Sequence, residues 1–220
     1  MATSQEVEIK FLVPDLKALE KHLKASGFKR ETPSTHEINT LYDLPNQQLR
    51  RKGEILRLRI YGGKWKLTHK AKGKPGKHKS RAEAETGVSD GKQMDAILRA
   101  LGFSPVFVYE KFRSEWADGE GQVVLDHTPL GDVAEIEGKS RWIDRTARTL
   151  GVDSKSYITK SYGELFIDWK RKTKCEAVNM TFRECGERAK AASVSFSKNS
   201  SKRTDRAASS SRPKSGSRTR

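Results

Sequence analysis

Charged and apolar residues alternate in several short segments of this chain. In the segment EVEIK, an extended strand would place Glu6, Glu8 and Lys10 on one face and Val7 and Ile9 on the other. The same alternation returns later, at Arg57 and Arg59, Lys66 and Lys70, Arg81, Glu83 and Glu85, Lys111 and Arg113, and Glu135 and Glu137. The pattern predicts a set of strands that each carry one charged face.

About eight strands and four helices are predicted. Seven strands follow the first one, at residues 38–42, 55–61, 64–70, 81–88, 106–116, 122–126 and 134–137. Apolar spacings of three and four residues predict helices at 16–27, 91–101 and 142–150, each followed or ended by a glycine, and a last helix at 161–169. The order of strands and helices favours an α+β fold.

Net charge divides the chain into a body and a tail. Residues 170–220 hold 15 lysines and arginines against 4 acidic residues, so most of the formal charge of +16 lies there. We therefore predict a folded domain at 1–170 and a basic tail at 171–220, disordered beyond about residue 190 because it has few apolar residues to bury. The tail either contacts nucleic acid or other polyanions weakly, or is a solvated extension without a function.

Other site types are disfavoured by spacing. Cys175 and Cys185 do not have zinc-finger spacing, and the five histidines are scattered. The loop KGKPGKHKS at 72–80 lacks the phosphate-binding glycine pattern. No apolar stretch is long enough for a membrane span and no secretion signal is recognised, so we expect a cytoplasmic protein without a membrane partner. A homodimer is compatible with the sequence, but no residue argues for it.

Two structures explain alternating charge. An antiparallel sheet with one wet face needs no function at all. A closed barrel with its apolar faces outward under helices would instead gather the charges around an aqueous channel. Clustered carboxylates suit Mg²⁺ or Mn²⁺, and neighbouring arginines and lysines suit phosphate groups. The second structure predicts a metal and polyphosphate site.

The ordered set of these segments resembles the CYTH family, the triphosphate tunnel metalloenzymes. The segments that carry the resemblance span about residues 4–169 and include EVEIK, TLYD at 40–43, LRLR, LTHK, the Glu83 and Glu85 pair, Asp126 and EIE at 135–137. The resemblance implies an eight-stranded antiparallel tunnel barrel, closed, with helices packed outside it. It also implies binding of a triphosphate-containing small molecule together with Mg²⁺ or Mn²⁺.

Site roles follow from the resemblance, residue by residue. The implied metal ligands are Glu6, Glu8, Glu83, Glu85, Glu135 and Glu137. The implied phosphate-binding residues are Lys10, Arg57, Arg59, Lys66, Lys70, Lys111 and Arg113. The implied catalytic residues are Glu6, Glu8, Lys10, Lys70 and Asp126, with Asp126 orienting cations or a second metal. For each residue, a structural ion pair is the alternative to the functional role.

The resemblance leaves the reaction open. The best match is to class IV adenylate cyclases, which convert ATP into cyclic AMP and pyrophosphate. The alternative is a triphosphatase that hydrolyses inorganic tripolyphosphate, thiamine triphosphate or a nucleoside triphosphate. Thiamine triphosphatases have a tyrosine where this chain has Leu41, which disfavours thiamine triphosphate as the substrate. A non-catalytic module that binds polyphosphate or nucleic acid, and a scaffold held by ion pairs alone, are further hypotheses.

Overall fold

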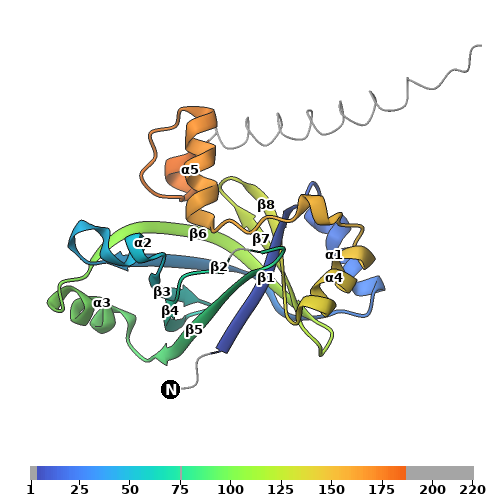
Figure 1. Ribbon diagram of the computed structural model, residues 1–220, viewed down its shortest axis with the longest axis horizontal. Coiled ribbons are helices and arrows are strands. Elements are labelled where there is room, and N and C mark those ends of the chain that lie inside the picture. The colour runs from blue at the N-terminus through green and yellow to red at the C-terminus, as the bar shows by residue number, and fades with distance from the viewer. Residues whose placement is uncertain (1–3, 75, 187–220) are drawn as a thin grey trace, which may run out of the picture.

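The structure, a computed structural model, describes residues 4–74 and 76–186 as a closed antiparallel barrel with helices around it (Figure 1). The predicted eight-stranded barrel is confirmed. The strands are β1 (Ser4–Leu12), β2 (Lys29–Asp43), β3 (Ile55–Tyr61), β4 (Lys64–Lys70), β5 (Lys79–Val88), β6 (Ser104–Ala117), β7 (Gln122–Thr128) and β8 (Gly131–Glu137). Around the barrel they run in the order β1, β5, β4, β3, β2, β6, β7, β8, so β1 closes the ring against β8.

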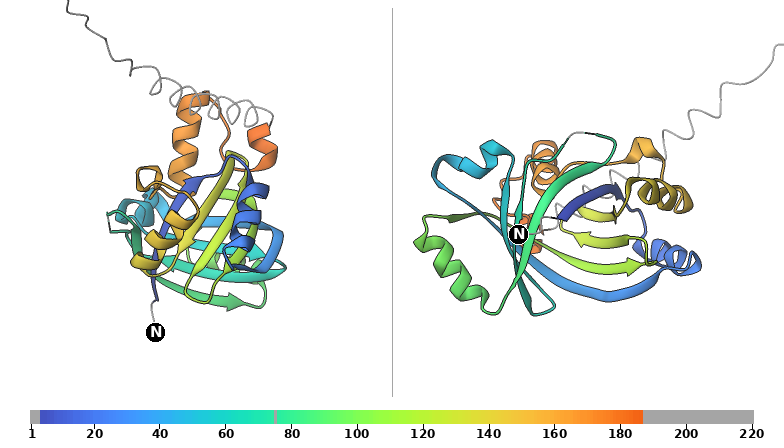
Figure 2. Two further views of the ribbon diagram at one scale, coloured as in Figure 1. Left: turned by 90° about the vertical axis from the view of Figure 1, so that its right-hand side faces the viewer. Right: turned by 60° about the horizontal axis from the view of Figure 1, so that its bottom comes forward.

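Along the described residues, helices α1 to α5 connect or flank the strands. They are α1 (Leu16–Ala25), α2 (Gln48–Lys52), α3 (Gly91–Ala100), α4 (Ser140–Thr149) and α5 (Tyr162–Thr173), with short 3₁₀ turns at Pro45–Gln47 and Ser154–Ser156. Asp15 and Asp90 cap α1 and α3 by accepting backbone N–H groups, as their positions before the apolar spacing predict. Helices α1 and α4 lie on one flank of the barrel and α3 at the opposite end (Figures 1 and 2).

The apolar core lies between the barrel wall and the helices. Outward-facing Ile9, Trp116 and Ile136 are fully buried and pack in one cluster with Leu23 of α1 and Ile143 of α4. The alternation of the sequence therefore places apolar side chains outside the wall and charged ones inside it. Helices cover the apolar face, because that face would otherwise meet water at a cost of about 25 cal/mol per Å².

Strand β2 is longer than its sequence predicts. The alternation covers only residues 38–42, yet β2 pairs with β6 from Lys29 onward, with register shifts near Thr32 and Thr35. Pro33 and the polar residues around it give no alternation of apolar and polar positions, so the sequence does not predict a strand there. Pairing with the long strand β6 stabilises the strand conformation. The extension carries Glu37 into the barrel.

The fold continues past residue 170, where the sequence predicts the domain boundary. After α5, the chain returns to β6, where Met180 donates a 3.0 Å bond to Val108 O and accepts a 3.1 Å bond from Glu110 N. Met180 is fully buried and Cys185 is 2% exposed. Disorder beyond about residue 190 concerns residues outside those described. Within the described residues, none of the helices has the length and the apolar composition needed to cross a membrane.

Candidate functional site

The interior of the barrel is a charged cavity of about 450 Å³, lined by side chains from all eight strands and by the start of α5. Of the predicted site residues, all but Asp126 line it. Asp126 is fully buried and contacts Lys111 and Arg113, which do line the cavity. The alternation in the sequence thus brings thirteen predicted residues to one cavity, with Asp126 in contact with two of them, and their roles stay predictions.

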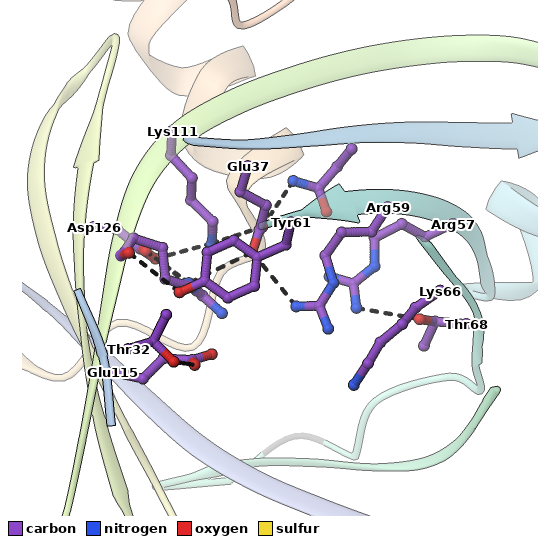
Figure 3. A network of polar contacts seen from close by, with 12 residues as sticks. Thr32, Glu37, Arg57, Arg59, Tyr61, Lys66, Thr68, Lys111, Glu115 and Asp126 are labelled. Atoms are coloured by element: carbon purple, nitrogen blue, oxygen red, sulfur yellow. Dashed lines mark hydrogen bonds and ion pairs between the residues drawn. The ribbon is translucent and has the colours of Figure 1, made fainter. Parts of the chain in front are cut away.

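Two buried carboxylates, Glu37 and Asp126, form ion pairs with the cations on one wall of the cavity (Figure 3). Lys111 Nζ lies 2.9 Å from Asp126 and 3.5 Å from Glu37, and Arg113 donates to both oxygens of Asp126. Burial raises the pKa of Glu37, but Lys111, Arg113 and Arg59 outweigh it and hold that pKa far below its usual value. Glu37 is therefore ionised, and the two carboxylates fix the cations beside them.

The opposite wall pairs Glu83 and Glu85 with cations. Lys70 Nζ lies 2.8 Å from Glu83 and 2.6 Å from Glu6. Glu85 accepts a 2.6 Å bond from Lys66 and lies within 3.6 Å of the guanidinium groups of Arg57 and Arg59, which Figure 3 shows side by side with Lys66. In this structure, Glu83 and Glu85 thus hold cations in place.

Four carboxylates gather where β1 meets β8. Glu8 and Glu137 are cross-strand neighbours, and Glu135 lies opposite Lys10 in the same ladder. Burial, together with the charges of Glu6, Glu135 and Glu8, raises the pKa of Glu137 to about 7. We refer to Glu6, Glu8, Glu135 and Glu137 as the acidic corner.

The acidic corner fits a divalent cation by its chemistry. Glu6 Oε2 is buried without a hydrogen bond and has only Arg81 Nε at 3.6 Å, and Glu137 has no ion-pair partner within the described residues. A cation there would relieve the repulsion among oxygens of the type that Mg²⁺ prefers. However, the described residues contain no ready-made cluster of three metal-binding side chains, because Lys10 lies between Glu8, at 2.6 Å, and Glu135, at 3.3 Å. A metal would have to displace the Lys10 ammonium.

Several cavity residues are missing from the sequence-based list of site residues. Glu37 and Asn39 are fully buried beside the lining residues, and both were detectable, since Asn39 lies in the predicted strand at 38–42 and Glu37 directly precedes it. Lys79 extends the alternation of β5 by one step before Arg81, and both line the cavity. Tyr162, another missed residue, begins a helix and carries no signal of an inward position; its ring is buried beneath Lys111, 4.5 Å from the ammonium.

Leu41 lies on the cavity wall, opposite Arg57 of β3 and Phe107 of β6 in the two ladders. With Ile55 and Tyr109 it forms a small less polar area in an otherwise charged cavity. Leu41 thus places an aliphatic side chain on the cavity wall.

Comparisons with known proteins agree with this architecture. The model of the CYTH domain matches residues 4–162. A protein of Methanocaldococcus jannaschii named "putative adenylate cyclase" is 26% identical over 171 residues, which are 73% of this chain and 97% of that protein. A structure from Vibrio parahaemolyticus, also described as a "putative adenylate cyclase", superposes with a TM-score of 0.66 at 21% identity over 76% of this chain and 99% of that one.

A plant structure has the same fold. It is the "putative adenylyl cyclase" HpAC1 from Hippeastrum, described as having a dominant triphosphatase activity. It superposes with a TM-score of 0.56 at 19% identity and covers 74% of this chain and 96% of that one. The match to the family model ends at Tyr162, so most of α5 and the segment that follows it lie outside the matched region.

Proposed function

The chain belongs to the CYTH domain family, and from that premise we propose that it is a divalent-metal-dependent enzyme that acts on triphosphate compounds inside the barrel. The observation that carries this proposal is a set of unused hydrogen-bond donors. The Nε–H groups of Arg57 and Arg59 are buried, belong to residues that line the cavity and make no hydrogen bond, and that of Arg81 has only Glu6 Oε2 at 3.6 Å. An unpaired buried donor on a charged group costs more than about 1–3 kcal/mol, so an anionic ligand is the natural acceptor.

The phosphate groups would bind along the cationic walls. The residues in position are Lys10, Arg57, Arg59, Lys66, Lys70, Lys111 and Arg113, all of which line the cavity. Arginine forks match the oxygens of a phosphate group, and lysines add positive charge beside them. Because Glu37 and Asp126 hold Lys111 and Arg113 from behind, these cations are oriented before the ligand arrives.

The acidic corner would hold the divalent metal. Mg²⁺ or Mn²⁺ bound there would neutralise charge on the phosphate oxygens and so favour phosphoryl or nucleotidyl transfer. In the absence of a metal, Lys10 supplies the positive charge between Glu8 and Glu135. We propose that the ammonium of Lys10 moves toward the phosphate groups when the ligands bind, which keeps it in the cavity as a second source of positive charge.

For the reaction itself, we propose adenylate cyclase activity of the class IV type. The 3′-hydroxyl oxygen of ATP would attack the α-phosphorus, and pyrophosphate would leave, giving cyclic AMP. Two points support the proposal: the name of the relative from Methanocaldococcus jannaschii, and Leu41 at a position on the cavity wall where a thiamine triphosphatase has its tyrosine. Positioning and charge neutralisation suffice for this chemistry, so no covalent residue is needed.

Triphosphate hydrolysis is the second candidate, and the composition of the cavity favours it. Leu41, Ile55, Tyr109 and Tyr162 are the apolar or aromatic side chains among the described lining residues, which leaves little surface for a nucleobase. Inorganic tripolyphosphate would need only the charged walls. In that reaction water attacks the terminal phosphorus and orthophosphate is released. The activity named for the Hippeastrum structure is compatible with this candidate.

Product analysis separates the candidates. Purified protein with Mg²⁺ or Mn²⁺ would be given ATP, tripolyphosphate or thiamine triphosphate in separate reactions, and cyclic AMP, pyrophosphate and orthophosphate would be resolved. Cyclic AMP and pyrophosphate from ATP support the cyclase, whereas orthophosphate without cyclic AMP supports the triphosphatase. Tight binding without turnover of any substrate would contradict both and favour a binding module.

A further inference from the structure

The barrel wall is incomplete between β1 and β5. The two strands pair only from Ser4 to Glu8 on β1, where Glu8 faces Lys79. Beyond that point Lys10 instead exchanges two backbone hydrogen bonds with Ile158, at 2.9 and 2.8 Å. The segment after α4 therefore fills the gap that β5 leaves, and it leads directly to Ser161 and Tyr162 at the cavity.

A second segment borders the same gap. The loop at residues 71–78 connects β4 to β5, and His78 at its end directly precedes Lys79, the first residue of β5. His78 is 12% exposed at its side chain, whereas Lys77 beside it is 53% exposed. The side chains of this segment are thus exposed up to Lys77, largely buried at His78 and on the cavity wall at Lys79.

One carboxylate on α4 fastens both segments. Asp144 Oδ1 lies 2.9 Å from His78 Nε2 and accepts a 3.3 Å bond from the hydroxyl of Tyr157, next to Ile158. Its Oδ2 accepts a 2.8 Å bond from Lys77. Asp144 lies outside the cavity, so it can influence a ligand there only through the segments that it holds.

Lys79 is the least tightly paired of the cavity lysines. Its acidic partner is Glu8 Oε1 at 3.8 Å, whereas Lys10, Lys66 and Lys70 each lie 2.6 Å from a carboxylate. The charges of Lys10 and Arg81 act against it from both sides. An ammonium that is largely buried, poorly paired and flanked by like charges gains more from an added anion than one already in a close ion pair.

Resting on the proposed function, we propose that Lys79 is a further phosphate-binding residue and that Asp144 is its positioning residue. Asp144 holds His78 against the outside of the gap, and because side chains alternate along a strand, the next residue then points inward. Lys79 thereby faces the same cavity as the unpaired arginine donors. Ligand binding is thus linked to α4, a helix that contributes no residue to the cavity lining.

The test is calorimetric titration of the full chain with tripolyphosphate in the presence of Mg²⁺, using Lys79→Gln, Asp144→Ala and the double variant. A charge-assisted hydrogen bond contributes about 1.5–3 kcal/mol, so Lys79→Gln should weaken binding at least about tenfold. Asp144→Ala should weaken it by a smaller factor. In the double variant the loss should equal that of Lys79→Gln alone if Asp144 acts on the ligand through His78 and Lys79, whereas an effect through Tyr157 and Ile158 would add to it.

Controls keep the result specific. Lys79→Arg preserves the charge and should retain most of the affinity, and Lys92→Gln, on the exposed face of α3, should leave it unchanged. Asp144→Asn, which keeps an acceptor for His78 and Tyr157, should lie between the wild type and Asp144→Ala, so a folding defect of the alanine variant does not block the test.

Failure of this inference differs from failure of the proposed function. A wild-type protein that does not bind tripolyphosphate would overturn both. Unchanged affinity of Lys79→Gln beside a wild type that binds would overturn this inference alone. Losses from Lys79→Gln and Asp144→Ala that multiply in the double variant would overturn the positioning role, because they would show that Asp144 acts by a separate route.

Discussion

The hydroxyl of Tyr162 donates a 2.6 Å hydrogen bond to Oδ2 of Asp126. Tyr162 is the first residue of α5, a helix that stands outside the barrel, whereas Asp126 belongs to the interior of β7. The same oxygen accepts hydrogen bonds from Lys111 and Arg113. The start of α5 is therefore part of the charge network that supports the cavity.

Removing this hydroxyl should weaken the fold. We expect Tyr162→Phe to lower the free energy of unfolding by about 1.5–3 kcal/mol, because the lost bond was made to a buried charged acceptor. Urea denaturation measures the change. Tyr61→Phe is the matched control, since it loses a 3.2 Å bond to the neutral main-chain oxygen of Arg113 and should cost less. An equal loss in the two variants would contradict the role of Tyr162 in the network.

Glu37→Gln should be more damaging than its position in a polar strand suggests. The substitution removes a fully buried charge that lies near Lys111, Arg59 and Arg113. Breaking a buried ion pair from one side costs about 3–5 kcal/mol, because the partners remain buried without compensation. Glu31→Gln on the exposed part of the same strand is the control and should stay within about 0.5 kcal/mol of wild type in chemical denaturation. Similar stabilities of the two variants would show that Glu37 is not needed to balance the cations.

The acidic corner predicts how the metal-free protein responds to pH. The pKa of Glu137 is raised from 4.5 to about 7, so between these values the folded protein holds a proton that the unfolded chain has lost. Stability therefore falls as pH rises through that window and stays low above it. Glu137→Gln should remove this loss and stabilise the metal-free protein at pH 8 by up to about 3 kcal/mol.

Thermal melting at pH 5 and pH 8, with and without Mg²⁺, tests the acidic corner. We expect Mg²⁺ to stabilise the wild type more at pH 8, where Glu137 is ionised, and to have less effect on Glu137→Gln. Glu120→Gln, at a carboxylate whose side chain is 62% exposed, serves as the control. An equal response to Mg²⁺ in wild type and Glu137→Gln would argue against Glu137 as a metal ligand.

Gly91 tests the packing at the end of the barrel opposite α1 and α4. A Cβ atom at this first residue of α3 would lie 2.0 Å from the ring of Trp65 on β4. Gly91→Ala should therefore cost about 1–3 kcal/mol by overpacking, although alanine favours helices elsewhere. Gly87→Ala, where no atom lies within 4 Å, is the control in the same thermal melt. No difference between the two would mean that α3 shifts freely on the barrel.

Alternation made most of the cavity predictable, because in a strand every second side chain shares a face. Once the strands were identified, Arg57, Arg59, Lys111 and Arg113 had to point the same way, and the barrel closes around them. Alternation does not predict a strand where apolar and polar residues do not alternate. Lys29 to Thr35 of β2 is polar throughout, so pairing with β6 decides its conformation rather than its own sequence.

Two features of the structure had no local signal in the sequence, the position of Tyr162 at the cavity and the helix α2. Tyr162 reaches the cavity because α5 stands where the wall is open, and that position depends on the bridge between Lys10 and Ile158. The helix α2 was also missed, because it has only five residues, no apolar spacing and a left-handed residue, Gln47, before it. Contacts between segments distant in the sequence determine both features. Such contacts produce no periodic pattern of apolar residues from which they could be predicted.

Closure of the barrel has a consequence for how the protein folds. Lys10 of the first strand pairs with Glu135 of the last, so the ring closes only when segments about 125 residues apart meet. Joining such distant segments costs much chain entropy before any contact repays it, which slows folding. During synthesis, β1 leaves the ribosome before β5 and β8, the two strands with which it pairs. The acidic corner therefore cannot form until β8 has been synthesised. Assembly of the ligand site should therefore coincide with the slowest folding step.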